Sequence, residues 1–177
     1  TNAHVVNATD QFGRTVSNPF FTLKMSDGTV REAKVLGAAP DFDIALMRLT
    51  DASGLTPITL GSSDQVRVGD DVVAIGNALD LGDSPTVTKG IVSALDRSLP
   101  ETDSLTLHGL IQTDAPINHG NSGGALVNAQ GELVGIIDSE AFERGFFQGQ
   151  ELALLLAVVC TLSNGLLAQQ AGTALAA

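Results

Sequence analysis

The chain has 177 residues, 44% of them hydrophobic, and its 20 acidic and 9 basic residues give a formal net charge of −11. This hydrophobic content is sufficient for a buried core and argues against a disordered chain. Because proteins bind phosphate groups through Lys and Arg, the acidic balance argues against a nucleic-acid partner. The length fits one domain, or one compact fold made of two small halves.

The single cysteine, Cys160, excludes an intramolecular disulfide and a multi-cysteine metal site. It ends the apolar run 152–160, which is too short to span a bilayer. We find no His, Cys and carboxylate residues at ligand spacing. We therefore expect no metal, no organic cofactor and no membrane span in this chain.

Short runs rich in Val, Ile, Leu and Thr, separated by turn residues, predict β-strands along most of the chain. The first two, 20–25 and 29–35, flank Ser26-Asp27-Gly28, which is typical of a hairpin turn. Further strands are predicted at 44–49, 72–76, 86–93, 110–113, 125–127 and 133–137. Residues 152–159 are predicted as a final strand, although their composition also suits a helix, and 161–170 as a terminal helix. This pattern indicates an all-β barrel or sandwich.

The pentapeptide Gly120-Asn121-Ser122-Gly123-Gly124 places a serine among glycines. Without a Cβ, glycine allows a tight turn that points successive N–H groups at one spot, as an oxyanion hole requires. An ordinary polar turn with a bystander serine explains the same residues equally well. The pentapeptide alone therefore does not identify a nucleophile.

The positions of the histidines distinguish between serine hydrolase classes, because a serine nucleophile needs a base. The chain has His4, His108 and His119, and none follows Ser122, which excludes the Ser, acid, His order of α/β-hydrolases. The subtilisin order would use His108 and a parallel α/β fold, whose crossover helices are not predicted. The chymotrypsin order of His, Asp and Ser remains, with His4 and Asp43 as candidates, although each alone is more often a structural residue.

Segments 1–6, 41–46 and 120–124 resemble the three triad motifs of the HtrA/Deg family of trypsin-like serine proteases. Segments 60–77, 90–95 and 111–115 resemble the same family, so that the similarity covers roughly residues 1–165. The resemblance implies a chymotrypsin-like fold of two six-stranded β-barrels, with the active site between them.

Under this resemblance the chain divides into four parts. Residues 1–55 form the remainder of the first barrel, which is incomplete at its N-terminal strands because none precedes His4. Residues 56–71 are a connector, residues 72–160 the second barrel, and residues 161–177 a short C-terminal helix and tail.

The resemblance also implies the role of each site residue. His4 acts as general base and then general acid, Asp43 orients His4, and Ser122 attacks the scissile carbonyl. The backbone N–H groups of Gly120 and Ser122 form the oxyanion hole. The residues expected to bind substrate are Ile117, Ile136, Ile137, Asp138 and Glu140. Asp138 and Glu140 could attract a basic side chain, but we favour the interpretation in which both point to solvent.

Three further features depart from the family pattern. His119 stands where proline usually precedes the oxyanion glycine, so this loop is less fixed in φ. Residues 135–140 replace a Gly-Ile-Asn-Thr strand, and residues 151–156 replace a Gly-Phe-Ala-Ile-Pro-like strand. These two segments change the expected walls of the specificity pocket.

The resemblance implies an ATP-independent serine endopeptidase that cleaves unfolded or misfolded polypeptides outside the cytoplasm, in the periplasm or cell envelope. Such a substrate would bind as an added β-strand beside the second barrel. A homotrimer is expected for the full-length protein. Two alternatives stay open: a protease-like peptide-binding or chaperone module that does not cut, and a fragment without activity of its own.

Overall fold

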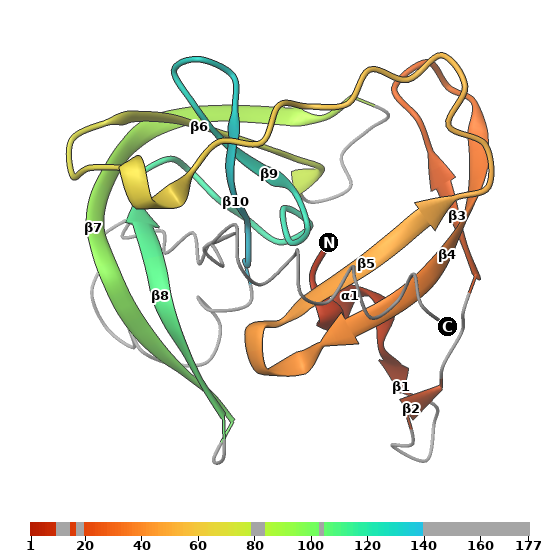
Figure 1. Cartoon of the computed structure of the whole chain (residues 1–177), viewed down its shortest axis with the longest axis horizontal. Coiled ribbons are helices and arrows are strands. Elements are labelled where there is room, and N and C mark those ends of the chain that lie inside the picture. Colours follow the sequence, from red (N-terminus) through yellow and green to blue (C-terminus); the bar gives the residue numbers. More distant parts are fainter. Residues whose placement is uncertain (10–14, 17–19, 79–83, 103–104, 140–177) are drawn as a thin grey trace.

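The computed structural model describes residues 1–9, 15–16, 20–78, 84–102 and 105–139, and it consists mainly of antiparallel β-sheet. Two groups of strands lie side by side, and the connector after β5 runs from one to the other (Figure 1). The N-terminus lies between the two groups (Figure 1). The predicted all-β class is confirmed.

The first group contains a three-stranded antiparallel sheet in the order β3-β4-β5. Its strands are β3 (Phe20–Lys24), β4 (Val30–Ala39) and β5 (Ile44–Leu49), and a separate pair is formed by β1 (Ala8–Thr9) and β2 (Thr15–Val16). The predicted hairpin between β3 and β4 is confirmed, with Gly28 at φ 79° in its turn. Asp27 Oδ1 accepts hydrogen bonds from the Thr29 N–H at 2.8 Å and the Thr29 hydroxyl at 2.6 Å. These bonds stabilise the ionised carboxylate and lower the pKa of Asp27.

The second group is a five-stranded antiparallel sheet in the order β10-β9-β6-β7-β8. Its strands are β6 (Asp71–Gly76), β7 (Thr86–Thr102), β8 (Leu105–Thr113), β9 (Ala125–Asn128) and β10 (Leu133–Ile136). Strand β7 continues well beyond the predicted 86–93, because it keeps pairing with β8 through several shifts of register. Such irregularities bend a strand and increase its twist, and β7 curves along one side of the molecule (Figure 1).

The main core belongs to this second sheet. Side chains from all five of its strands and from the loops beside them pack together with little or no exposure. The buried members are Val66, Val72, Ala74, Val92, Ile111, Ala115, Ile117, Leu126, Val134 and Ile137. This packing gives the loop between β8 and β9 a rigid support, because two of the core residues, Ala115 and Ile117, come from that loop.

The chain before α1 (Ala3–Val6) is attached to the first sheet. Asn2 forms a bridge with Ile44, and the Ala45 N–H donates to the Thr1 carbonyl oxygen at 2.8 Å. The Ala3 N–H in turn donates to the Asp43 carbonyl oxygen at 2.9 Å. Residues 1–3 therefore fix the position of α1 beside the start of β5.

The predicted connector is pinned to the second sheet. Leu60 forms a parallel bridge with Leu133, and the Gly61 N–H donates to the Leu133 carbonyl oxygen at 2.8 Å. Within the connector lies a short 3₁₀ helix, η2 (Ser63–Gln65). The predicted final strand at 152–159 and helix at 161–170 lie outside the described residues, and the division of the chain into four parts stays a prediction.

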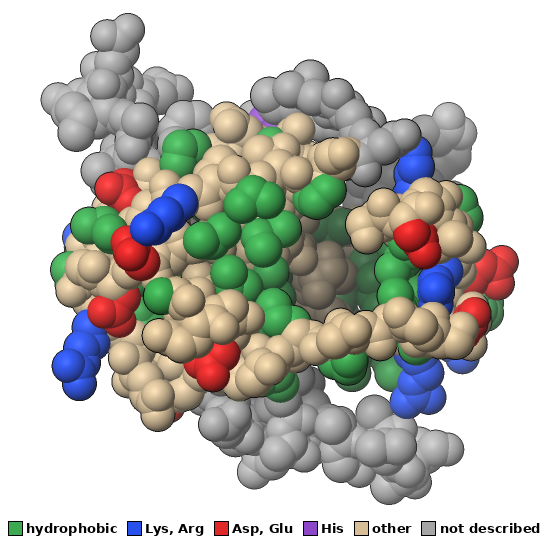
Figure 2. All heavy atoms as spheres, turned by 90° about the horizontal axis from the view of Figure 1, so that it is seen from above, with side chains coloured by type: hydrophobic (Ala, Val, Ile, Leu, Met, Phe, Trp, Pro, Cys, Tyr) green, Lys and Arg blue, Asp and Glu red, His purple; other side chains and the backbone are tan. Residues whose placement is uncertain are grey.

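One face of the molecule shows how its charge is distributed. In Figure 2, hydrophobic side chains gather near the middle of this face, while Lys and Arg side chains are scattered among Asp and Glu. In the described part of the chain, no helix has the length and apolar character needed to cross a membrane.

Candidate active site

His4 is presented by α1, a single helical turn closed by a hydrogen bond from the Asn7 N–H to the Ala3 carbonyl oxygen at 3.0 Å. The neighbours Ala3 and Val6 are buried, with exposed fractions of 2% and 5%, so they anchor the turn. His4 itself is half-buried, with its side chain 21% exposed. The turn therefore holds the histidine at the surface of the first sheet, where a substrate can reach its ring.

Asp43 lies between η1 (Pro40–Phe42) and β5, with left-handed backbone angles of φ 50° and ψ 39°. Aspartate is one of the few residues that tolerate this conformation. The turn is closed by a hydrogen bond from the Asp43 N–H to the Pro40 carbonyl oxygen at 3.0 Å. This geometry directs the Asp43 carboxylate to α1, where it is 8% exposed.

Two contacts join Asp43 to His4. The Oδ1 atom accepts the His4 backbone N–H at 2.9 Å, and Oδ2 lies 2.6 Å from His4 Nδ1. Because an ionised carboxylate can only accept a hydrogen bond, Nδ1 carries the hydrogen. The neutral ring then has its lone pair on Nε2, which is the arrangement a general base requires.

Ser122 lies in the loop between Ile117 and β9. Two hydrogen bonds fold this loop: Asn121 N–H to the Asn118 carbonyl oxygen at 3.1 Å, and Gly124 N–H to the Asn121 carbonyl oxygen at 2.9 Å. A Cβ at Gly124 would lie 2.3 Å from the Ile75 carbonyl oxygen. Only glycine fits here, since any other residue would push the loop away from β6.

The same loop is also bonded to the chain after β10. Gly123 N–H donates to the Ile137 carbonyl oxygen, and Ile137 N–H donates to the Gly124 carbonyl oxygen, both at 2.9 Å. Gly120 has φ 86°, another position that favours glycine. Within the described part of the chain, the backbone N–H groups of Gly120 and Ser122 donate to no other residue. No acceptor from the described residues therefore occupies these two donors.

The Ser122 hydroxyl is hydrogen-bonded to Ser139. The two hydroxyl oxygens lie 2.7 Å apart, and the Ser139 backbone N–H donates to Ser122 Oγ at 2.9 Å. Sequence reasoning did not identify Ser139, because no motif marks a serine two residues after the core residue Ile137. Its burial, with 6% exposed, is visible only in the folded chain.

The predicted substrate-binding residues occupy different environments. Ile117 and Ile137 belong to the core of the second sheet, with exposed fractions of 4% and 0%, whereas Ile136 is half-buried. Glu140 lies outside the described residues. The substrate-binding role of this set stays a prediction.

The expectation that Asp138 points to solvent is wrong. Asp138 is 2% exposed, and together with His4 and Asp43 it forms a group whose ring nitrogen and carboxylate oxygens all lie within 4.8 Å of one another. The error arises because the chain after β10 turns inward toward the first sheet. That turn depends on tertiary contacts and leaves no mark in the alternation of residues.

These three side chains are of types that bind metals, but the 2.6 Å contact between His4 Nδ1 and Asp43 Oδ2 is a hydrogen bond. Two ligands of a tetrahedral zinc ion would be about 3.4 Å apart, from Zn–N and Zn–O lengths of about 2.1 Å. His4, Asp43 and Asp138 therefore form an acid–base group.

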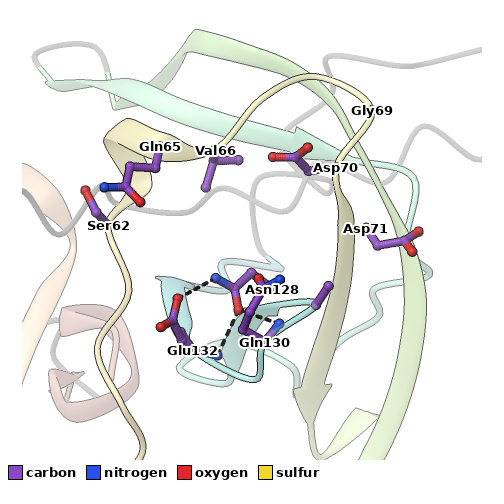
Figure 3. A pocket seen from close by; sticks show the side chains of 10 residues that line it. Ser62, Gln65, Val66, Gly69, Asp70, Asp71, Asn128, Gln130 and Glu132 are labelled. Carbon is purple, nitrogen blue, oxygen red and sulfur yellow. Dashed lines mark hydrogen bonds between the residues drawn. The ribbon is translucent and has the colours of Figure 1, made fainter.

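A hollow of about 700 Å³ lies elsewhere on the second sheet, between the connector and the β9–β10 turn (Figure 3). The polar groups of its β9–β10 turn are bonded to each other: Asn128 Nδ2 donates to Glu132 Oε2 at 2.8 Å, and Asn128 Oδ1 accepts the Gln130 N–H at 3.0 Å. None of His4, Asp43 and Ser122 lines it. We therefore assign the candidate active site to the triad residues.

A sequence model of the trypsin-like peptidase domain matches residues 1–136, and the chain belongs to this family. Within it, the chain is 46% identical over 139 residues to the "Periplasmic pH-dependent serine endoprotease DegQ" of Escherichia coli, covering 77% of this chain and 27% of that protein. It is 52% identical over 119 residues to the "Serine protease PepD" of Mycobacterium tuberculosis, covering 65% of this chain and 25% of that protein.

The fold is also similar to that of a solved protein described as "HtrA-type protease AlgW with decapeptide". That comparison has a TM-score of 0.74 and 34% identity, and it covers 97% of this chain and 46% of the other. The resemblance to the HtrA/Deg proteases and the chymotrypsin-like fold are confirmed. The chain spans about a quarter of the length of the two curated relatives named above.

Proposed function

We propose that the protein is a serine endopeptidase that cleaves unfolded or misfolded polypeptides with His4, Asp43 and Ser122. The main support is the pair of contacts between Asp43 and His4, which fix the ring and leave Nε2 as the acceptor. Membership of the trypsin-like peptidase family supports the same chemistry.

In this mechanism His4 takes the proton of the Ser122 hydroxyl as its oxygen attacks the scissile carbonyl. Asp43 stabilises the imidazolium that forms. The open N–H groups of Gly120 and Ser122 bind the developing oxyanion, and loss of one such donor costs about 3–4 kcal/mol of transition-state stabilisation. The hydrogen bond from the Ser122 hydroxyl to His4 Nε2 that this step requires is part of the proposal.

The proposed location is outside the cytoplasm, in the periplasm or cell envelope, because several relatives carry "periplasmic" in their names. Unfolded polypeptides are the proposed partners, since they can add a strand along the second sheet through main-chain hydrogen bonds. A homotrimer remains the proposed assembly of the full-length protein.

A second candidate function is peptide binding without cleavage. It is favoured by the two contacts of the Ser122 hydroxyl with Ser139, which hold the nucleophile in a resting position. The presence of His119 where proline usually fixes the loop favours it too.

Hydrolysis of unfolded casein separates the two functions. The endopeptidase predicts casein fragments that accumulate with time and disappear in Ser122→Ala. A binding module predicts retained casein and no fragments. Equal cleavage by the wild-type chain and Ser122→Ala would overturn the assignment of the nucleophile.

A further inference from the structure

Asp138 is a buried carboxylate for which the proposed mechanism has no role. It lies after β10 with 2% of its surface exposed, next to the residues that hydrogen-bond to the loop of Ser122. Burial of an ionised carboxylate is costly unless a positive or hydrogen-bonding partner compensates it. Its surroundings must therefore contain such a partner.

The imidazolium form of His4 is one group that can compensate the charge of Asp138. A carboxylate oxygen of Asp138 lies within 4.8 Å of a ring nitrogen of His4, and within the same distance of an Asp43 carboxylate oxygen. The Asp43 contacts already use the His4 Nδ1 hydrogen and the His4 backbone N–H. The imidazole thus has a second carboxylate beside it, supplied by a different sheet.

We propose that Asp138 is a positioning residue of the acid–base group, which holds the His4 ring in place and stabilises its imidazolium form. This inference rests on the proposed function, because the imidazolium matters for catalysis only when His4 takes the proton of Ser122. In that step the proton moves from Ser122 Oγ to His4 Nε2 while the Ser122 oxygen bonds to the substrate carbonyl carbon. The positive charge then lies close to two carboxylates.

Among the residues that the structure describes, two carboxylates are placed within 4.8 Å of the His4 ring: Asp43, just before β5, and Asp138, after β10. Asp43 is the same in the wild-type protein and in the Asp138 variants used below, so differences between them report on Asp138.

The sign of the effect follows from charge. An anion within about 4–6 Å favours the protonated imidazole, so Asp138→Asn should lower the pKa of His4 by about one unit or more. The acid limb of the kcat/KM profile should move to lower pH by the same amount. At alkaline pH, kcat/KM should fall several-fold, since the imidazolium of the transition state loses one of its two anions.

The direct test follows the three histidines by ¹H–¹⁵N NMR through a pH titration, in the Ser122→Ala background. His4 is read without turnover, so the result is independent of whether the protein is a protease. His108, which lies 2.8 Å from the Ser98 hydroxyl, and the exposed His119 serve as internal controls of the fold. Asp41→Asn is the matched variant, because Asp41 is an exposed carboxylate two residues before Asp43.

The proposal predicts a lower pKa for His4 in Asp138→Asn, little change in Asp41→Asn, and unchanged His108 and His119 in both. An unchanged or raised His4 pKa in Asp138→Asn would overturn it. Asp138→Glu restores the charge and should return the His4 pKa toward the wild-type value.

If Asp138→Asn also changes the titrations of His108 and His119, the substitution has altered the fold. The test is then made on the Ser122→Ala protein, in which Asp138 is intact. The side-chain ¹³C signal of Asp138 must then show an ionised carboxylate over the pH range in which His4 titrates. A neutral Asp138 throughout that range would contradict the proposal. Failure of the proposed function would appear separately, as absent casein cleavage with this titration behaviour intact.

Discussion

Gly124→Ala should displace the loop that carries Ser122. A Cβ at this position would lie 2.3 Å from the Ile75 carbonyl oxygen and 2.8 Å from the Asn121 carbonyl oxygen. Both neighbours are backbone atoms, and Ile75 is held within β6, so no change of rotamer relieves the contact. Ordinary contact begins at 3.4 Å, so the loop and β6 must separate by about 1.1 Å.

That separation sets the expected losses of stability and of activity in Gly124→Ala. Overpacking of this kind costs about 1–3 kcal/mol of the free energy of unfolding. A misplacement of about 1 Å at a reacting group lowers the rate by about 100-fold. Urea unfolding measures the first quantity, and hydrolysis of an unfolded protein substrate measures the second.

Gly37→Ala is the matched control, because Gly37 lies in β4 with nothing within 4 Å of its added Cβ. Its free energy of unfolding should stay within about 0.5 kcal/mol of wild type, as for a surface substitution, and its activity should not change. If Gly124→Ala were as stable and as active as Gly37→Ala, the geometry of this loop would not set the position of Ser122.

Two further substitutions test the hydrogen bonds of the site. Asp43→Asn removes the charge that orients His4 and should lower kcat by about 10⁴-fold, as in a serine protease whose histidine adopts the wrong tautomer. A loss of less than tenfold, in a variant with wild-type circular dichroism, would contradict the role of Asp43. Ser139→Ala removes one hydroxyl contact of about 1 kcal/mol from Ser122 and should speed fluorophosphonate labelling about fivefold. Slower labelling of Ser139→Ala would show that Ser139 assists the nucleophile and does not restrain it.

Much of the fold could be predicted because its signals are local. The Asp27-Gly28 turn and the alternation on either side specify the β3–β4 hairpin, and β5 has the predicted bounds of 44–49. The full length of β7 could not be predicted, since its second half is a strand only through pairing with β8.

The candidate site divides in the same way. The order of His4, Asp43 and Ser122 is visible in the sequence, and the contact between His4 and Asp43 agrees with it. The environment of Asp138 could not be predicted, because an acid after a strand usually meets solvent and its burial depends on how two sheets approach each other. The contact between Ser139 and Ser122 joins segments 17 residues apart and has no sequence motif.

The most direct test of the central claim is labelling of the protein with a fluorophosphonate, which reacts only with an activated serine. The account predicts one label per chain on the peptide that contains Ser122, none in Ser122→Ala, and labelling slowed by at least about 100-fold in His4→Ala, since a general base contributes about 10²–10⁴-fold. Unchanged labelling in Ser122→Ala, or no labelling of the wild-type protein, would contradict the claim that His4 and Asp43 activate Ser122.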